Sequence, residues 1–180
     1  MKKVAVMIAT GFEEIEALTV VDIMRRANIL CDMVSIQGSL NVLGAHNIDV
    51  QCDKVINEEL KEYDLIVLPG GMPGATNLRD NKKVIELIQH FNKNNKLIGA
   101  ICAAPIILAK ANVIKDKNIT SYPGFEEELE GCNYKDDRVV VDGNIITSRG
   151  PATAMEFSYE LLKALGSEEY KTLSKGMLYN

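Results

Sequence analysis

One of the four cysteines in the sequence stands where a protein can turn a thiol into a nucleophile. Cys102 lies in the run LIGAICAAPIILA, directly after an apolar segment that predicts a strand and directly before one that predicts a helix. A side chain on such a turn is displayed at the edge of a sheet, and its small neighbours leave room for a substrate. A helix N-terminus lowers a thiol pKa, so we expect a reactive thiolate. Position alone fits a small buried core cysteine equally well.

A carboxyl group that could assist the thiol occurs near the start of the chain. Glu16 falls in GFEEIEA, on the first turns of the helix expected after the first strand, and could point inward over the strand ends. Beside a thiolate it would keep its proton, because two adjacent anions are costly in a low dielectric, and it could act as general acid or base. A solvated helix acid is the more ordinary interpretation of its spacing. We predict that role for Glu13 and Glu14, at the positive end of the helix dipole.

Two segments rich in glycine and proline could supply backbone groups to the same site. PGGMPGA, residues 69–75, follows a buried strand, and the amide of Gly71 could bind a developing oxyanion together with the amide of Ala103. A simple turn is the alternative, since Pro-Gly-Gly is common in loops. SRGPATA, residues 148–154, could add Arg149 or backbone groups to the rim. The chain lacks the GxGxxG and GxxxxGK[ST] patterns of dinucleotide and P-loop sites.

The remaining cysteines and the two histidines carry weaker signals. Successive cysteines are 21, 50 and 30 residues apart, so no close-spaced ligand pair exists, and we predict no metal site. Cys31 and Cys132 are expected to be incidental, and Cys52 to be exposed or at an interface. His46 and His90 have no plausible catalytic partner in the sequence, which disfavours a Cys–His dyad.

The composition is that of a globular domain. The chain has 180 residues, of which 47% are apolar and 25% charged, and we expect a single domain over residues 1–180. Its 20 basic and 25 acidic residues give a charge of −5, which argues against binding the nucleic-acid backbone. No run approaches the roughly 20 apolar residues that cross a bilayer, and no signal peptide opens the chain. We therefore expect a cytoplasmic protein with reduced thiols and no membrane partner.

Alternating strands and helices must position these residues. Apolar runs predict strands over residues 4–9, 31–36, 65–68, 97–101, 119–121, 139–141 and 145–148. Helices are expected over residues 12–27, 83–94, 104–110, about 151–165 and 167–175, with Gly166 ending the fourth and a hairpin or edge excursion over residues 40–50. This alternation predicts a mostly parallel, doubly wound sheet with helices on both faces. Active sites in such sheets form at the carboxyl ends of strands, which here are residues 10–16, 69–74, 102–105 and 148–151.

Five segments, in this order, resemble the ThiJ/PfpI family: GFEEIEA, VVDIMRRANI, YDLIVLPGGMPGA, GAICAAP and TSRGP. The resemblance runs from Val4 to about Leu165 and is greatest to the branch of the parkinsonism-associated protein deglycase and the bacterial YajL-like proteins. It implies an α/β, flavodoxin-like three-layer sandwich, similar to class I glutamine amidotransferase domains. It also implies a homodimer that needs no cofactor.

The resemblance assigns roles to individual residues. It implies that Cys102 is the reactive cysteine, that Glu16 is the acid hydrogen-bonded to it, and that the amides of Gly71 and Ala103 form the oxyanion site. Other matching positions belong to the dimer interface or the pocket. The interface residues would be Asp22, Arg26 and Cys52, and the pocket residues Tyr122, Arg149 and Pro151.

Two positions depart from the family's pattern. Tyr122 stands where the animal deglycase has a pocket histidine, which removes a possible proton shuttle, although a phenol can donate a hydrogen bond. Ala103 stands where protease-like members have a histidine. With no HxE motif late in the chain, protease and glutaminase activities are disfavoured.

The resemblance implies an enzyme of small dicarbonyls. Members of this branch are described as glutathione-independent glyoxalases (hydro-lyases) that convert methylglyoxal or glyoxal to hydroxy acids. They are also described as protein deglycases (hydrolases) acting on early glycation adducts. The alternative is an oxidative-stress sensor or redox-regulated chaperone with little catalysis, since the same thiol would be readily oxidised.

Overall fold

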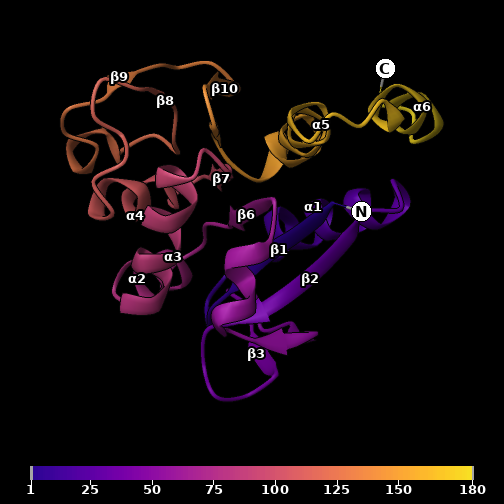
Figure 1. Ribbon diagram of the computed structural model, residues 1–180, viewed down its shortest axis with the longest axis horizontal. Helices are drawn as coiled ribbons and strands as arrows, with labels where there is room; N and C mark the ends of the chain where they lie inside the picture. Colours follow the sequence, from indigo (N-terminus) through magenta and orange to yellow (C-terminus); the bar gives the residue numbers. More distant parts are fainter. Residues whose placement is uncertain (1, 180) are drawn as a thin grey trace.

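The central sheet of the protein has seven strands. In the computed structural model, which describes residues 2–179, these are β1 Lys3–Ile8, β2 Leu30–Ser35, β5 Lys54–Val55, β6 Leu65–Leu68, β7 Leu97–Ile101, β10 Val139–Asp142 and β11 Ile145–Ser148 (Figure 1). Their order across the sheet is β10-β11-β7-β6-β1-β2-β5. All neighbours are parallel except the antiparallel pair β10 and β11. The predicted mostly parallel sheet is confirmed.

The central strands are apolar along their length because both faces of the sheet are covered. Every residue of β6 is buried, and in β1 only Lys3 is exposed. Successive side chains of β1 belong to two separate cores: Ala5 and Met7 to one, Val4 and Val6 to the other. The continuous apolar runs in the sequence therefore mark a sheet buried on both sides.

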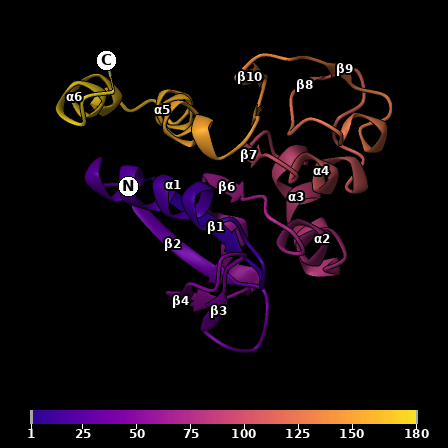
Figure 2. The same ribbon diagram turned by 180° about the vertical axis from the view of Figure 1, so that it is seen from behind.

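Helices cover both faces of this sheet. Within residues 2–179 they are α1 Glu14–Arg26, α2 Gly74–Arg79, α3 Lys82–Lys93, α4 Pro105–Lys110, α5 Ala154–Ala164 and α6 Glu169–Gly176. Buried side chains of α2, α3 and α4 contribute to one core and those of α1 and α5 to the other, while α6 contacts α5. Figures 1 and 2 show the two helix groups on opposite sides of the sheet, which is the predicted three-layer sandwich. No helix in the described part of the chain is long and apolar enough to cross a membrane.

Short elements complete the fold. The predicted hairpin is present as β3 Asn41–Leu43 paired with β4 Asp49–Gln51, and β8 Asn118–Ile119 pairs with β9 Asn133–Tyr134. Three short 3-10 helices are η1 Glu58–Glu62, η2 Glu126–Glu128 and η3 Pro151–Thr153. The helix predicted from Pro151 thus starts as η3 and continues as α5. One helix was not expected from the sequence: α2, a six-residue helix that begins directly after Pro73.

The carboxyl ends of β1, β6, β7 and β11 meet at one edge of the sheet. These strands are adjacent and parallel, so the segments that follow them lie side by side. That edge receives the turn into α1, the Pro69–Gly71 loop, Cys102 and Arg149. The topology therefore brings together the four strand ends that the sequence nominated.

Candidate active site

Cys102 follows β7 in a backbone conformation that few residues adopt. Its φ is +65°, in the left-handed region, and its side chain is partly buried. Its amide donates to the carbonyl of Ser148 (2.9 Å), and its carbonyl accepts from the amide of Tyr122 (2.9 Å). A non-glycine residue in this conformation costs on the order of 1 kcal/mol or more and persists only where its surroundings fix it. The two backbone hydrogen bonds provide that fixation.

The Cys102 thiol faces two backbone amides and one carboxyl group. The amides of Ala103 and Gly71 lower the pKa of the Cys102 thiol and the carboxyl group of Glu16 raises it, so all three groups lie beside the sulfur. Amides at these positions favour negative charge on sulfur or on an oxygen bound to the same carbon.

Glu16 is fully buried although it lies in the first turn of α1. Its Oε2 accepts from the amide of Gly70 (2.8 Å). Its Oε1 has no hydrogen-bond partner in residues 2–179, although the Cys102 thiol lies beside the carboxyl group. Glu16 therefore points inward, and the more ordinary interpretation of its spacing as a solvated helix acid is wrong.

Two glycines allow the loop after β6 to approach this pair. A Cβ on Gly70 would lie 2.7 Å from Cβ of Cys102 and 2.9 Å from Oε2 of Glu16. Gly71 has a φ of +83°, and a Cβ there would lie 2.4 Å from the amide nitrogen of Glu13. Glycine is therefore required at both positions: Gly70 for space, and Gly71 for space and for its backbone conformation.

Burial couples the ionisation of the thiol and the carboxyl. Desolvation raises the pKa of Glu16 to about 7, against the hydrogen bonds from Gly70 and Cys102, and the charge of Glu13 raises it further. Desolvation raises the pKa of the Cys102 thiol to about 12, reinforced by Glu16 and opposed by the amides of Ala103 and Gly71. Two adjacent anions are disfavoured here. Above neutral pH the pair therefore carries one negative charge and one shared proton.

The prediction that a helix dipole lowers the pKa of Cys102 is wrong. α4 begins three residues later, at Pro105, and has only six residues, so few aligned peptide dipoles act on the thiol. Desolvation by burial is the largest influence on the pKa of the Cys102 thiol and raises it. Activation of this thiol falls to the two amides and to proton transfer with Glu16.

Glu13 and Glu14 are buried, so the prediction of solvated acids is also wrong. Their exposed fractions are 9% and 4%. The turn of the β3–β4 hairpin covers them: Oε1 of Glu14 accepts from the amide of His46 (2.7 Å), and Oε2 lies 2.8 Å from Nδ1 of the same residue. Oε2 of Glu13 lies 3.6 Å from that Nδ1. His46, which has no partner nearby in the sequence, thus has two in the fold.

The same three side chains offer the donor types of a metal site, with ligand atoms within 4.8 Å of one another. Their contacts are those of an ion pair, because the imidazole and the Glu14 carboxylate already hydrogen-bond each other.

The predicted pocket residues line one hollow, whose lining residues do not include Cys102. Tyr122, Arg149 and Pro151 share a hollow of about 300 Å³ with Pro123, Arg138 and residues 150–153. Nη1 of Arg149 donates to Oδ1 of Asp136 (2.6 Å), which holds the guanidinium at the rim. Tyr122 is about half exposed and reaches Cys102 through its backbone. The hollow is walled mostly by carbon atoms, with cationic groups at its edge.

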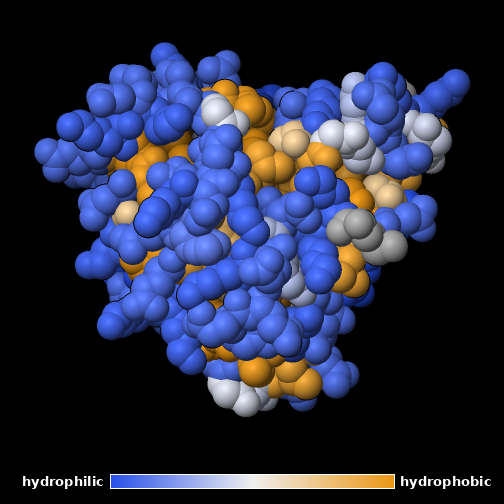
Figure 3. Space-filling model, viewed as in Figure 1, coloured by the Kyte–Doolittle hydropathy of each residue, from blue (hydrophilic) through white to orange (hydrophobic). Residues whose placement is uncertain are grey.

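The residues predicted for a dimer interface fall into two groups. Asp22 and Arg26 form an exposed ion pair on α1 (2.6 Å), in line with the exposed Ile15. Cys52 is only 2% exposed and belongs to the core cluster that contains the buried apolar side chains of α1 and α5, so the expectation of an exposed Cys52 is wrong for the single chain. Figure 3 shows apolar side chains at the lower end of the molecule, over the β3–β4 hairpin, where Leu43 and Ile48 are exposed.

The other thiols lie elsewhere. Cys31 is buried in β2, and Cys132 is partly buried in the loop before β9. Desolvation raises the pKa of Cys31 to about 12 and that of Cys52 to about 11. For neither thiol do backbone amides oppose this rise in pKa, as those of Ala103 and Gly71 do for Cys102.

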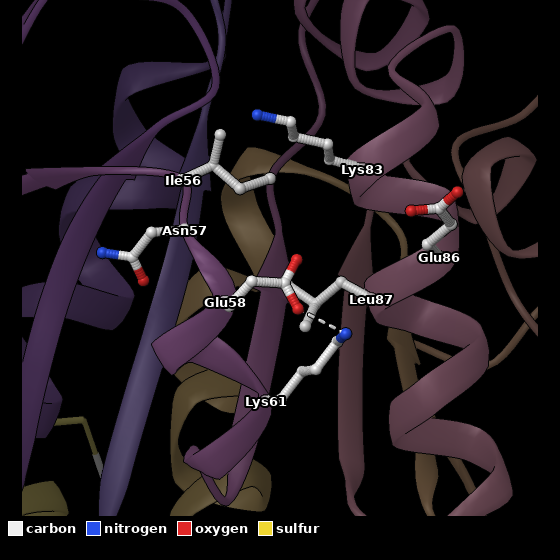
Figure 4. A pocket seen from close by; sticks show the side chains of 7 residues that line it. All are labelled: Ile56, Asn57, Glu58, Lys61, Lys83, Glu86 and Leu87. Carbon is white, nitrogen blue, oxygen red and sulfur yellow. Dashed lines mark hydrogen bonds and ion pairs between the residues drawn. The ribbon is translucent and has the colours of Figure 1, made fainter.

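A second hollow, of about 260 Å³, lies between η1 and α3 (Figure 4). Glu58 and Lys61 pair with each other on its η1 side, and Lys83 and Glu86 lie on its α3 side. It contains no thiol and lies outside the group of strand ends around Cys102.

Comparison with known proteins identifies relatives over nearly the whole chain. The sequence model of the DJ-1/PfpI family matches residues 2–164. Protein dj-1beta of Drosophila melanogaster is 36% identical over 98% of this chain and 97% of its own. Protein DJ-1 homolog B of Arabidopsis thaliana is 36% identical over 98% of this chain, which spans 41% of that protein. The solved structure of oxidized Toxoplasma gondii DJ-1 superimposes with a TM-score of 0.94 at 33% identity, covering 99% and 98% of the two chains.

Proposed function

The chain belongs to the DJ-1/PfpI family, and on that premise we propose that it is a cysteine-dependent enzyme of small dicarbonyls. It would convert methylglyoxal or glyoxal to a hydroxy acid without glutathione, or release such groups from early glycation adducts. The observation that carries this proposal is the buried Cys102–Glu16 pair with two amides directed at its sulfur.

The first step uses the proton shared by the pair. Glu16, as carboxylate, accepts the thiol proton of Cys102 while the sulfur attacks the aldehyde carbon of methylglyoxal. The C–S bond forms, the carbonyl π bond breaks, and the amides of Gly71 and Ala103 stabilise the oxyanion. Protonation of that oxygen gives a hemithioacetal.

The second step moves hydrogen between the two carbons. Glu16 removes the proton from the carbon bonded to sulfur, giving an enediol, and a proton is returned to the neighbouring carbon. The first carbon is oxidised to a thioester and the second is reduced to a carbinol, so no external oxidant is needed. Water then hydrolyses the thioester to lactate and regenerates the thiol.

The pKa of Glu16 is suited to proton transfer in both steps. A group that both accepts and returns protons is most effective when its pKa lies near the working pH, and burial raises the pKa of Glu16 to about 7. The hollow lined by Tyr122, Arg149 and Pro151 would receive the rest of the substrate.

We extend the proposal to the assembly and its setting. Ile15, Asp22 and Arg26 lie on one exposed stripe of α1, which suits the interface of a homodimer. A cytoplasmic location and action as one domain over residues 1–180 remain part of the proposal.

A steady-state assay of methylglyoxal without glutathione tests the activity. We expect Cys102→Ser to lose turnover and Glu16→Gln to lower it by roughly 10²–10⁴-fold, the usual contribution of a general acid or base. Cys132→Ser, which removes a partly buried thiol outside the site, is the matched control and should retain wild-type rates. Full turnover by Cys102→Ser would refute the proposal.

A second candidate is a redox sensor with little catalysis. A structure of Toxoplasma gondii DJ-1 is described as oxidized, and Cys102 here is partly accessible. Peroxide would oxidise the thiolate to a sulfenate, with release of water. Selective oxidation of Cys102 in mass spectra, with negligible methylglyoxal turnover, would favour this function.

A further inference from the structure

Three buried carboxyl groups lie within four residues at the start of α1. Glu13, Glu14 and Glu16 are all less than 10% exposed. Glu16 retains a proton near neutral pH because burial raises its pKa to about 7. Buried carboxylates that remain ionised require a nearby cation. In residues 2–179 the basic group in contact with Glu13 and Glu14 is the imidazole of His46.

Although the side chain of His46 is exposed, hydrogen bonds hold this residue in place. Its amide and its Nδ1 both bond to the Glu14 carboxylate, at 2.7 and 2.8 Å. The amide of Ala45 donates to the carbonyl of Phe12 (2.8 Å), which holds the hairpin turn on the helix start. A Cβ on Gly44 would lie 2.2 Å from Oε1 of Glu14, so glycine makes this approach possible. Nε2 remains free to gain or lose a proton.

The acids that face His46 are also coupled to the thiol site. The amide of Glu13 donates to the carbonyl of Gly70 (3.0 Å), the residue whose own amide holds Glu16. The charge of Glu13 acts on Glu16, and Glu16 acts on Cys102. A continuous set of contacts therefore leads from His46 through Glu13 to the reactive pair.

We propose that His46 is a positioning residue whose charge balances Glu13 and Glu14 and thereby makes the reactivity of the Cys102–Glu16 pair depend on pH. The proposal rests on the reactive role of Cys102 in the proposed function but not on the identity of its substrate.

The sign of the effect follows from the charges. Glu13 and Glu14, both on the first turn of α1, are the charged groups that face His46, and they raise its pKa. The imidazolium offsets their field and favours the single negative charge of the Cys102–Glu16 pair. When Nε2 loses its proton, Nδ1–H still donates to Glu14. The hairpin keeps its place while the compensating charge disappears, and ionisation of the pair becomes less favourable.

Alkylation of Cys102 by iodoacetamide, followed by mass spectrometry between pH 5.5 and 9 in buffer with EDTA, tests this. His46→Asn keeps a donor at the position of Nδ1 but has no charge. We expect this variant to react about threefold more slowly than wild type at pH 6, which is the size of effect expected from one partly screened charge. At pH 9, where His46 is neutral, the two proteins should react equally fast. His46→Arg, which keeps the charge, should match wild type at pH 6 and exceed it at pH 9.

The outcomes separate this inference from the proposed function. If His46→Asn follows wild type at every pH, or is slower by one constant factor, His46 has only a structural role and the inference is wrong. If Cys102 of the wild-type protein does not react at any of these pH values, both the inference and the proposed function fail.

Discussion

Replacing Glu16 by Gln should stabilise the fold at alkaline pH while removing activity. Glutamine keeps a carbonyl oxygen for the amide of Gly70 and fills the same buried space, but it cannot ionise. In the folded protein desolvation raises the pKa of Glu16 from 4.5 to about 7. Between these values the folded state binds more protons than the unfolded state, so this group makes the wild type less stable as the pH rises.

The structure sets the size of this effect. The difference between the two pKa values corresponds to about 3 kcal/mol in the free energy of unfolding, lost between about pH 4.5 and 7. The free energy of unfolding of the Glu16→Gln protein minus that of the wild type should therefore be up to about 3 kcal/mol larger at pH 8 than at pH 4.5. The gain would show that ionisable Glu16 is kept at a cost in stability.

Urea unfolding at pH 4.5 and pH 8, at one fixed protein concentration, measures this difference. Glu62→Gln, which removes an exposed carboxyl group, is the matched control and should show little change between the two pH values. A stability difference between Glu16→Gln and wild type that is the same at both pH values would refute the reasoning. In that case the carboxyl would ionise normally despite its burial.

Two further substitutions test the geometry around the thiol. Gly71→Ala should lower the free energy of unfolding by more than Gly124→Ala, because both glycines have a positive φ (+83° and +96°) but only a Cβ at Gly71 would meet backbone, 2.4 Å from the amide of Glu13. We expect about 1 kcal/mol for Gly124→Ala and at least twice that for Gly71→Ala in urea titrations, and equal losses would argue against the tight contact. Tyr122→Phe should keep methylglyoxal turnover within about threefold, because the phenol has no hydrogen-bond partner in residues 2–179 while its ring lines the hollow. A loss of a hundredfold or more, on the scale of general acid catalysis, would instead make the Tyr122 phenol a proton donor.

The elements that the sequence predicts best are those whose burial is uniform. β6, β7 and β11 begin and end at the predicted residues, and the first two are apolar throughout because they are parallel strands covered on both faces. β5 was missed because it has only two residues, and α2 because its sequence GATNLR has few apolar residues, unlike the equally short α4, PIILAK. The residues around Cys102 could be nominated for a similar reason: the carboxyl ends of adjacent parallel strands must meet, whatever the details of packing.

Errors arose where distant segments change the environment of a side chain. Glu13 and Glu14 look solvated in the sequence, but the hairpin turn at residues 44–48, some thirty positions later, removes them from water. His46 gained its partners in the same way. Cys52, at the end of a short strand, was expected to be exposed or at an interface, yet it is buried in the core cluster that also contains the buried apolar side chains of α1. The hydrophobic pattern of a helix or strand predicts which of its residues face the core. It does not predict which residues a distant segment of the chain covers.

The sequence by itself determined that Cys102 sits on a strand-to-helix turn, that Glu16 and the Gly70–Gly71 loop follow neighbouring strands, and that the chain belongs with a known family. These are properties of local spacing and of the topology that such spacing imposes. Only the tertiary structure decided the electrostatics of the site: that burial outweighs a short helix and raises the pKa of the Cys102 thiol, and that Glu16 shares its proton. The energy of a charge depends on everything within several ångströms of it, and the fold alone fixes those neighbours.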